Sequence, residues 1–266
     1  MRIIRFLERG SKRICFGIQR EAGAVELLEG DFPDFSPTGR TADIGRLLAP
    51  IVPTDILCIG LNYRGHALEQ KSEIPKNPML FIKSGNSLAD PDEPVPLPPN
   101  SGQVDFEAEL AVVIGRTAKR VSRSQALGHV FGYTVANDVS ARDWQKDKAL
   151  NGGQFARGKS FDKFCPIGPA IVTADEVPDP NDLRLSLRLN GETMQDSSTR
   201  DMIFDVPAII ESLSSTMTLR PGSVILTGTP AGVGMARTPP IFLKAGDVTT
   251  VEIERVGTLV TRFTDE

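Results

Sequence analysis

The sequence of 266 residues is poor in cysteine and histidine, with only three and two of them. Cys15, Cys58 and Cys165 are too few and too widely spaced for a disulfide framework or a cysteine-rich zinc site. No apolar run approaches the ~18 residues of a membrane-spanning helix. The first residues, MRIIRFLERGSKR, lack the apolar stretch of a secretory signal. We therefore expect a cytoplasmic protein with reduced thiols and no membrane contact.

The sequence also lacks an excess of positive charge and several common catalytic signatures. Lys plus Arg number 30 against 34 Asp plus Glu, a net charge of −4, which argues against nucleic-acid binding. There is no Gly-x-Ser-x-Gly motif, and the cysteines have no convincing histidine partner, so a serine or cysteine nucleophile is not expected. The Gly-rich segment 225–234, ILTGTPAGVG, lacks the Lys-Ser/Thr ending of a phosphate-binding loop. Its backbone amides and Thr229 could still hold a carboxylate.

The composition that is present predicts a turn-rich α+β protein. Hydrophobic residues make up 40%, and there are 24 glycines and 20 prolines. Three short strand-like segments, RIIRFLE, RICFGIQ and AGAVELLEG, predict a small β-rich domain over residues 1–52. Residues 53–266 are predicted to form the larger domain, which is rich in strands.

Several local patterns place elements in the larger domain. GHALEQK (65–71) predicts a short helix and FDVPAIIESLSSTMTL (204–219) a longer one. SRSQALGHVFGYTVANDVS (122–140) predicts a Ser-capped helix that leads into a strand. Asn190-Gly191 predicts a hairpin turn. The Pro-dense segment 90–102 predicts an irregular connector.

An acidic pair stands out in the predicted strand VDFEAELAVVIG. Glu107 and Glu109 share one face about 7 Å apart, which an exposed acidic face would tolerate. Because the strand continues into a strongly apolar segment, a bound cation is the simplest partner for both carboxylates. Asp138 lies where another apolar strand ends, as a ligand or as a turn or N-cap residue. Arg142 and Gln145 follow at offsets of four and seven, on one helical face with Asp138.

A second pair could activate a proton acceptor. His66 and Glu69 are three residues apart in the predicted short helix, and a carboxylate on one imidazole nitrogen raises the basicity of the other. The alternative is an ordinary pair on a helix surface. Lys159, flanked by Gly158, Ser160 and Phe161, is either an electrophilic group or a surface charge.

Six motifs occur in the order found in one family: GLNYRGHALEQ, FIKSGNSL, VDFEAELAVVIG, NDVSARDWQ, ARGKSFDKFCPIGP and ILTGTPAGVG. Over roughly Pro53 to Thr261 the chain resembles the fumarylacetoacetate hydrolase family. It is most similar to the short bacterial members and the fumarylacetoacetate hydrolase domain-containing proteins. The resemblance implies an α+β mixed β-sandwich roll with a small, variable β-rich N-terminal domain, assembled as a homodimer.

The resemblance also implies a site. It places Mg²⁺, for which Mn²⁺ or Ca²⁺ can substitute, on Glu107, Glu109 and Asp138. It implies a water-activating pair, His66 and Glu69, on a lid (Asn62 to Ile74) that orders over the ligand. Stabilisation of the oxyanion would fall to Lys159 and Gln145. The implied substrate contacts are Arg142, Thr229, Tyr63 and Lys83.

The implied reaction is Mg²⁺-dependent cleavage of a C–C bond in a 2,4-dioxo acid, such as an acylpyruvate or a 2,4-diketo-3-deoxy sugar acid. The products are pyruvate, released as its metal-stabilised enolate, and a carboxylic acid. The same site would serve an oxaloacetate decarboxylase or a 2-hydroxyhepta-2,4-diene-1,7-dioate isomerase or hydratase. A metal-stabilised binding dimer without activity is the alternative outside catalysis. We expect contacts to the distal part of the substrate from the lid, the Pro-dense connector and the loop around Asn151 to Arg157.

Overall fold

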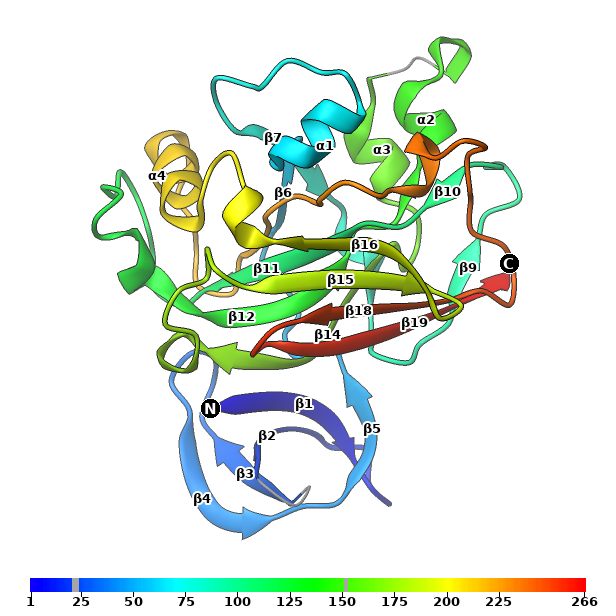
Figure 1. Ribbon diagram of the computed structural model, residues 1–266. Helices are drawn as coiled ribbons and strands as arrows, with labels where there is room; N and C mark the ends of the chain where they lie inside the picture. The colour runs from blue at the N-terminus through cyan, green and yellow to red at the C-terminus, as the bar shows by residue number, and fades with distance from the viewer. Residues whose placement is uncertain (21–23, 151–152) are drawn as a thin grey trace.

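A computed structural model describes residues 1–20, 24–150 and 153–266. Over these ranges the chain forms a 12-stranded, a five-stranded and a two-stranded sheet (Figure 1). The strands are β1 (Arg2–Glu8), β2 (Ile14–Gln19), β3 (Val25–Glu29), β4 (Ser36–Thr41), β5 (Ile44–Leu48), β6 (Ile56–Gly60), β7 (Met79–Lys83), β8 (Leu88–Ala89), β9 (Val95–Leu97), β10 (Val104–Asp105), β11 (Ala108–Ile114), β12 (Val130–Asn137), β13 (Ser140–Ala141), β14 (Cys165–Thr173), β15 (Arg184–Leu189), β16 (Glu192–Ser198), β17 (Val224–Leu226), β18 (Val248–Ile253) and β19 (Gly257–Asp265).

Short helices connect these strands. The α-helices are α1 (Arg64–Glu69), α2 (Arg142–Lys146), α3 (Phe155–Lys159) and α4 (Val206–Thr216). The 3-10 helices are η2 (Gly85–Ser87), η3 (Ala126–His129), η4 (Lys148–Leu150), η5 (Ala174–Glu176), η6 (Thr199–Asp201) and η7 (Gly234–Ala236). In Figure 1, α1, α2 and α3 gather at one end of the molecule, away from strands β1–β5. None of the helices in the described part of the chain is long and apolar enough to cross a membrane.

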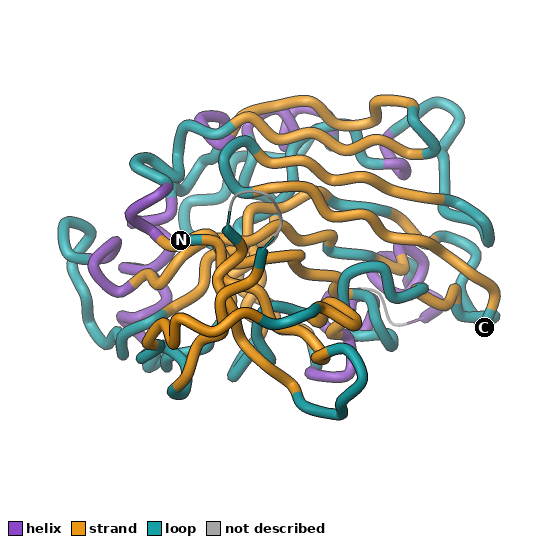
Figure 2. The backbone as a smooth tube through the Cα atoms, turned by 90° about the horizontal axis from the view of Figure 1, so that it is seen from below, coloured by secondary structure: helices purple, strands orange, loops and turns teal. Residues whose placement is uncertain are grey.

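The large sheet runs through the whole molecule in the order β4-β3-β2-β1-β14-β12-β11-β17-β6-β7, with β5 beside β1 and β8 beside β14. β1 pairs antiparallel with β14, so the strands of the first 50 residues continue the sheet of the rest of the chain. Because β1–β5 lie at the bottom of Figure 1, the view from below in Figure 2 looks onto them. The division at residue 52 thus falls within one continuous sheet.

The second sheet, β16-β15-β18-β19-β9, packs on one face of the first and encloses the main core. β11 is buried on both faces. Its side chains Leu110 and Val112 point into the core between the sheets, whereas Ala111 and Val113 point into a second apolar cluster on the opposite face. This alternation is the period-two geometry of a strand. It places Glu109 on the same face as Ala111.

These elements confirm the α+β prediction and most of the local ones. The strand predicted over VDFEAELAVVIG is present but interrupted between β10 and β11. Asn190 and Gly191 have φ of 51° and 88° between β15 and β16, as a hairpin turn with two left-handed residues requires. The helix predicted before β12 is only the short η3, because Gly128 and the start of β12 follow within a few residues.

The cap of α4 gives a stability prediction. The Asp205 carboxylate accepts from the Ala208 N–H at 2.9 Å and also forms an exposed ion pair with Arg123. Asp205→Ala should lower the free energy of unfolding by about 1 kcal/mol, the usual cost of losing an N-cap. Asp205→Asn should retain most of the stability, since an amide oxygen still caps. Urea denaturation of both variants checks this. Equal losses would mean that the ion pair, not the cap, stabilises the helix.

Candidate active site

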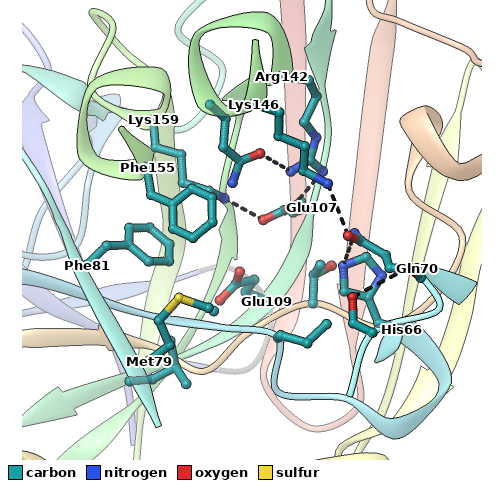
Figure 3. Close-up of a pocket in the computed structure, with 16 residues that line it drawn as sticks. His66, Gln70, Met79, Phe81, Glu107, Glu109, Arg142, Lys146, Phe155 and Lys159 are labelled. Atoms are coloured by element: carbon teal, nitrogen blue, oxygen red, sulfur yellow. Dashed lines mark hydrogen bonds and ion pairs between the residues drawn. The ribbon is translucent and has the colours of Figure 1, made fainter. Parts of the chain in front are cut away.

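A cavity of about 210 Å³ opens among α1, α2, α3, β7 and the start of β11 (Figure 3). It is smaller than the ~300–1,000 Å³ of pockets for drug-sized ligands, which favours a small ligand. One wall is apolar and the opposite wall carries charged and polar groups. The lining residues are Ile59, Gly60, Leu61, His66, Gln70, Ser72, Met79, Phe81, Glu107, Glu109, Arg142, Gln145, Lys146, Phe155, Lys159 and Thr229.

An acidic triad lies at the base of the cavity. Glu107 directly precedes β11, Glu109 is its second residue and Asp138 follows the end of β12. Because β11 and β12 are antiparallel neighbours, with Ala108 opposite Asn137, the start of one strand meets the end of the other. One oxygen from each of the three carboxylates lies within 4.8 Å of the others, and all three side chains are buried. The sequence prediction that these residues come together is therefore met.

Buried cations neutralise two of the three carboxylates. Lys159 Nζ lies 2.7 Å from Glu107 Oε2 and 2.5 Å from Asp138 Oδ2. Lys83 Nζ lies 2.5 Å from Asp138 Oδ1, and Arg142 Nη2 lies 2.6 Å from Glu107 Oε1. Burial alone would raise the pKa of Glu107, but Arg142 and Lys159 lower it well below its usual range. Burial disfavours the charged form of Lys159, yet Asp138 and Glu107 raise its pKa above the usual value.

Glu109 has no cation of its own among the described residues. Its Oε2 accepts a hydrogen bond from the Gly228 N–H at 2.6 Å. Burial, followed by the negative charges of Asp138 and Glu107, raises the pKa of Glu109 well above its usual value. The buried cluster thus contains one negative charge that the protein's own cations do not compensate, which favours the protonated form of Glu109 in the metal-free chain.

A divalent cation fits these residues. Three carboxylates with converging oxygens are the donor set of hard cations such as Mg²⁺, Mn²⁺ or Ca²⁺. Glu109 gives a specific reason to expect a cation here. Burial and the neighbouring negative charges favour its protonated form, and a cation beside it would replace that proton. The acidic triad can therefore hold a metal ion.

The predicted base pair is connected to a longer chain of hydrogen bonds. His66 Nδ1 lies 2.9 Å from Glu69 Oε2, and the other oxygen of Glu69 accepts from the Gly232 N–H at 2.8 Å. His66 Nε2 lies 2.9 Å from Gln70 Nε2, and Gln70 Oε1 accepts from Lys146 Nζ at 3.1 Å. Since an ammonium only donates, the Gln70 amide NH₂ must donate to His66 Nε2. His66 Nε2 is then the basic nitrogen, and Nδ1 carries the proton held by Glu69.

The residues at the start of α1 are fixed to distant parts of the chain. The Asn62 amide donates to the carbonyls of Thr227 and Phe204 at 2.7 and 3.0 Å, and it accepts from the Phe204 N–H. The Gly65 N–H donates to Asp201 Oδ2 at 2.8 Å. These contacts hold the backbone beside His66. Closure of the expected lid stays a prediction, and the anchoring restricts movement to residues after Glu69.

The remaining polar groups are oriented by a buried network. Arg142 Nε donates to Asp105 Oδ2 at 2.9 Å, and its Nη1 donates to Gln145 Oε1 at 3.0 Å. Gln145 therefore presents its amide NH₂ as a donor. Thr229 lines the cavity and accepts from Gln195 Nε2 at 2.8 Å. His66, Lys159, Gln145, Arg142 and Thr229 thus surround one space, as expected from the sequence.

Two predicted substrate contacts lie elsewhere. Tyr63 is fully buried in the main core and does not line the cavity. Lys83 is buried beneath the acidic triad, with Asp138 and the Val139 carbonyl as acceptors, and does not line the cavity either. In this structure the two side chains point into the protein and not into the cavity, so nothing here supports direct contact with a substrate. Lys83 instead holds Asp138 in place.

Of the three segments expected to contact the distal part of the substrate, two contribute residues to the cavity. Gln70 from the lid and Phe155 from the loop around Asn151 to Arg157 line the cavity, but no residue of connector 90–102 does. Asn151 itself lies outside the described residues. Sequence analysis missed Gln70, Lys146 and Asp105. The only signal for Gln70 is its position next to Glu69 in the helix, four residues after His66.

Comparison with known proteins decides the family. Residues 55–264 match Fumarylacetoacetate (FAA) hydrolase C-terminal. The chain belongs to the fumarylacetoacetate hydrolase family. Residues 1–50 match a second description, Rv2993c-like, N-terminal. Members of the family are enzymes, so the chain is assigned to an enzyme family.

Two named relatives and one solved structure are similar to this chain over most of its length. "Oxaloacetate tautomerase Fahd2a, mitochondrial" of Rattus norvegicus is 43% identical over 98% of this chain and 79% of its own length. "Oxaloacetate tautomerase fahd2, mitochondrial" of Xenopus laevis is 51% identical over 80% of this chain and 66% of its own length. The solved 2-hydroxyhepta-2,4-diene-1,7-dioate isomerase from Mycobacterium marinum superposes with a TM-score of 0.86 at 41% identity, covering 100% of this chain and 99% of that one. These likenesses also confirm the fold expected from the resemblance.

Neutralising Glu107 and neutralising Glu109 should have different effects on the stability of the metal-free protein. Glu107→Gln leaves Lys159 and Arg142 undercompensated, so the free energy of unfolding of the metal-free protein should fall by on the order of 3 kcal/mol. Glu109→Gln replaces a carboxyl group whose neutral form is favoured by a neutral amide whose oxygen can still accept from the Gly228 N–H, so stability should change little. Both should lose most affinity for Mg²⁺. Denaturation and calorimetric titration check this. Matching stability losses would contradict the charge assignment.

Metal binding should depend on pH through Glu109. Because its pKa is raised in the folded protein, the metal must displace a proton, and Mg²⁺ affinity should rise with pH. The unfolded chain ionises this carboxyl at its usual lower pKa. Stability of the metal-free protein should therefore fall as pH rises through the raised pKa. Calorimetry in two buffers of different ionisation enthalpy measures the released proton. Glu109→Gln is the control for the stability measurement and should lose the fall in stability assigned to this carboxyl group.

Proposed function

We propose that this protein is a divalent-metal-dependent enzyme that interconverts the keto and enol forms of a small 2-oxo acid, with oxaloacetate as the best candidate. The observation that carries the proposal is the position of His66 Nε2, a basic nitrogen at the edge of a cavity that Glu107 and Glu109 line, with Asp138 buried next to them. Tautomerisation moves one proton between C3 and the C2 oxygen and requires no nucleophile from the protein. The names of the Rattus and Xenopus relatives support the same reaction.

A divalent cation held by Glu107, Glu109 and Asp138 would supply Lewis-acid polarisation of the C1 carboxylate and C2 oxygen. His66 would take the C3 proton at Nε2 and pass it to the C2 oxygen, or carry it back in the reverse reaction, while Glu69 stabilises the imidazolium through Nδ1. The Gly232 N–H, which donates to Glu69, keeps that carboxylate aimed at the ring. Lys159 and Gln145 would donate to oxygen atoms on which negative charge develops.

Hydrolysis of an acylpyruvate, predicted from the sequence, is the second candidate. It is supported by Gln145, whose amide oxygen is occupied by Arg142 and whose NH₂ group can therefore donate to a tetrahedral oxyanion. In that reaction His66 would take a proton from water instead of carbon. The attacked carbonyl would lie next to the apolar wall of Met79, Phe81 and Phe155.

Decarboxylation of oxaloacetate and isomerisation of a 2-hydroxydienoate are further uses of the same site. The Mycobacterium marinum neighbour bears the name of such an isomerase. A cytoplasmic location stays a prediction, and the Rattus and Xenopus names place those relatives in mitochondria. The buried, unpaired state of Cys15, Cys58 and Cys165 is compatible with a reducing compartment.

Removal of the base should separate these reactions. His66→Ala should slow proton transfer at C3 of oxaloacetate by roughly 10²–10⁴, the usual contribution of a general base. Mg²⁺ affinity should persist, because His66 is not among the proposed ligands. Enol absorbance follows the tautomerisation, and CO₂ release follows decarboxylation, which needs no base. Unchanged tautomerisation in the variant would refute the proposed function of His66.

A substrate panel decides between the two leading candidates. Wild-type protein with Mg²⁺ should equilibrate enol and keto oxaloacetate faster than it releases a carboxylic acid from acetylpyruvate. Glu69→Gln should reduce both reactions, since both depend on His66. Gln145→Leu should reduce both reactions and hydrolysis more strongly, because a tetrahedral oxyanion depends on this donor more than an enolate oxygen that the metal would also stabilise. Faster cleavage of acetylpyruvate than tautomerisation would reverse the order of the two candidates.

A further inference from the structure

The cavity contains one cation that differs from the others. Arg142 is held by Asp105 and Glu107, and Lys159 by Glu107 and Asp138. Within residues 1–20, 24–150 and 153–266, no carboxylate forms an ion pair with Lys146, and its hydrogen-bond partner is the neutral amide of Gln70 at 3.1 Å. A cation that lines a cavity without a carboxylate partner is a candidate for binding an anionic group of a ligand.

The surroundings of Lys146 make this site favourable for an anion. It is the last residue of α2, and its side chain reaches over the cavity toward Gln70 (Figure 3). Burial, together with the charge of Arg142, lowers the pKa of Lys146, so a negative group beside it would relieve both effects. The acidic triad at the base takes the chelating end of the ligand, and Lys146 lies beside Gln70 at the exposed rim.

We propose that Lys146 binds the second carboxylate of a dicarboxylic 2-oxo acid and thereby selects such acids over their monocarboxylic analogues. The inference rests on the proposed function and names its substrate class. The bound carboxylate accepts from the Lys146 ammonium group, which in the absence of a ligand donates to Gln70.

A matched pair of substrates tests the assignment. 2-Oxobutanoate has a methyl group where oxaloacetate has its second carboxylate, so the two differ only at the group assigned to Lys146. With Lys146→Met, KM for oxaloacetate should rise about tenfold, as for loss of a charged hydrogen bond at an exposed rim, while kcat changes little. Deuterium exchange at C3 of 2-oxobutanoate should keep its kcat/KM. Lys146→Arg should restore most of the affinity for oxaloacetate.

Two controls separate the possible outcomes. Lys148→Met removes an exposed charge two residues further on, outside the cavity, and should leave both substrates unaffected. Oxalate, which fills the chelating positions without a further group, should inhibit wild type and Lys146→Met equally. If Lys146→Met keeps the wild-type preference for oxaloacetate, the assignment of Lys146 is overturned although the enzyme is active. If wild type acts on neither 2-oxo acid, the proposed function fails and the assignment fails with it.

Discussion

Compensation of buried charge is the constraint on which the rest of the site depends. Four buried carboxylates, Asp105, Glu107, Glu109 and Asp138, face three buried cations, Lys83, Arg142 and Lys159, in the described part of the chain. Such groups persist in a core only when paired and hydrogen-bonded. The three cations let the chain fold before any metal arrives, unlike small domains that need zinc in order to fold. The fourth carboxylate, Glu109, keeps the site ready for a divalent cation.

Much of this site could be predicted from local patterns. The spacing of Glu107 and Glu109 on a strand that becomes apolar indicated buried carboxylates, and the three-residue spacing of His66 and Glu69 indicated their contact. Local patterns could not identify long-range partners. Lys83 lies 55 residues from Asp138, and its ion pair depends on how β6 and β7 join the large sheet. Tyr63 was misplaced for the same reason, because the direction of its side chain is set by the core between the two sheets.

The cavity consists of two functional halves that come from different segments. The acidic triad lies where β11 and β12 meet, whereas His66 is held by α1, which is anchored to Asp201 and Phe204. In the proposed reaction, enolate stabilisation would require only the first half, and proton transfer would require both. Differences in the second half and its neighbours can therefore change the reaction while the first half is kept. This division explains how tautomerases and isomerases share one fold within the family.

The alternation along β11 also affects the fidelity of folding. A shift of this strand by one residue against β12 would turn Glu107 and Glu109 into the apolar core between the sheets and bring Ala108 and Leu110 to the cations. Glu107 would then be buried without its two cations, and Lys159 and Arg142 would each keep only one carboxylate, Asp138 and Asp105. The wrong pairing is penalised far more than in an ordinary apolar strand, where one hydrophobic side chain replaces another. Glu107 and Glu109 thus help to fix the register of β11 against β12 in the large sheet, independently of any reaction.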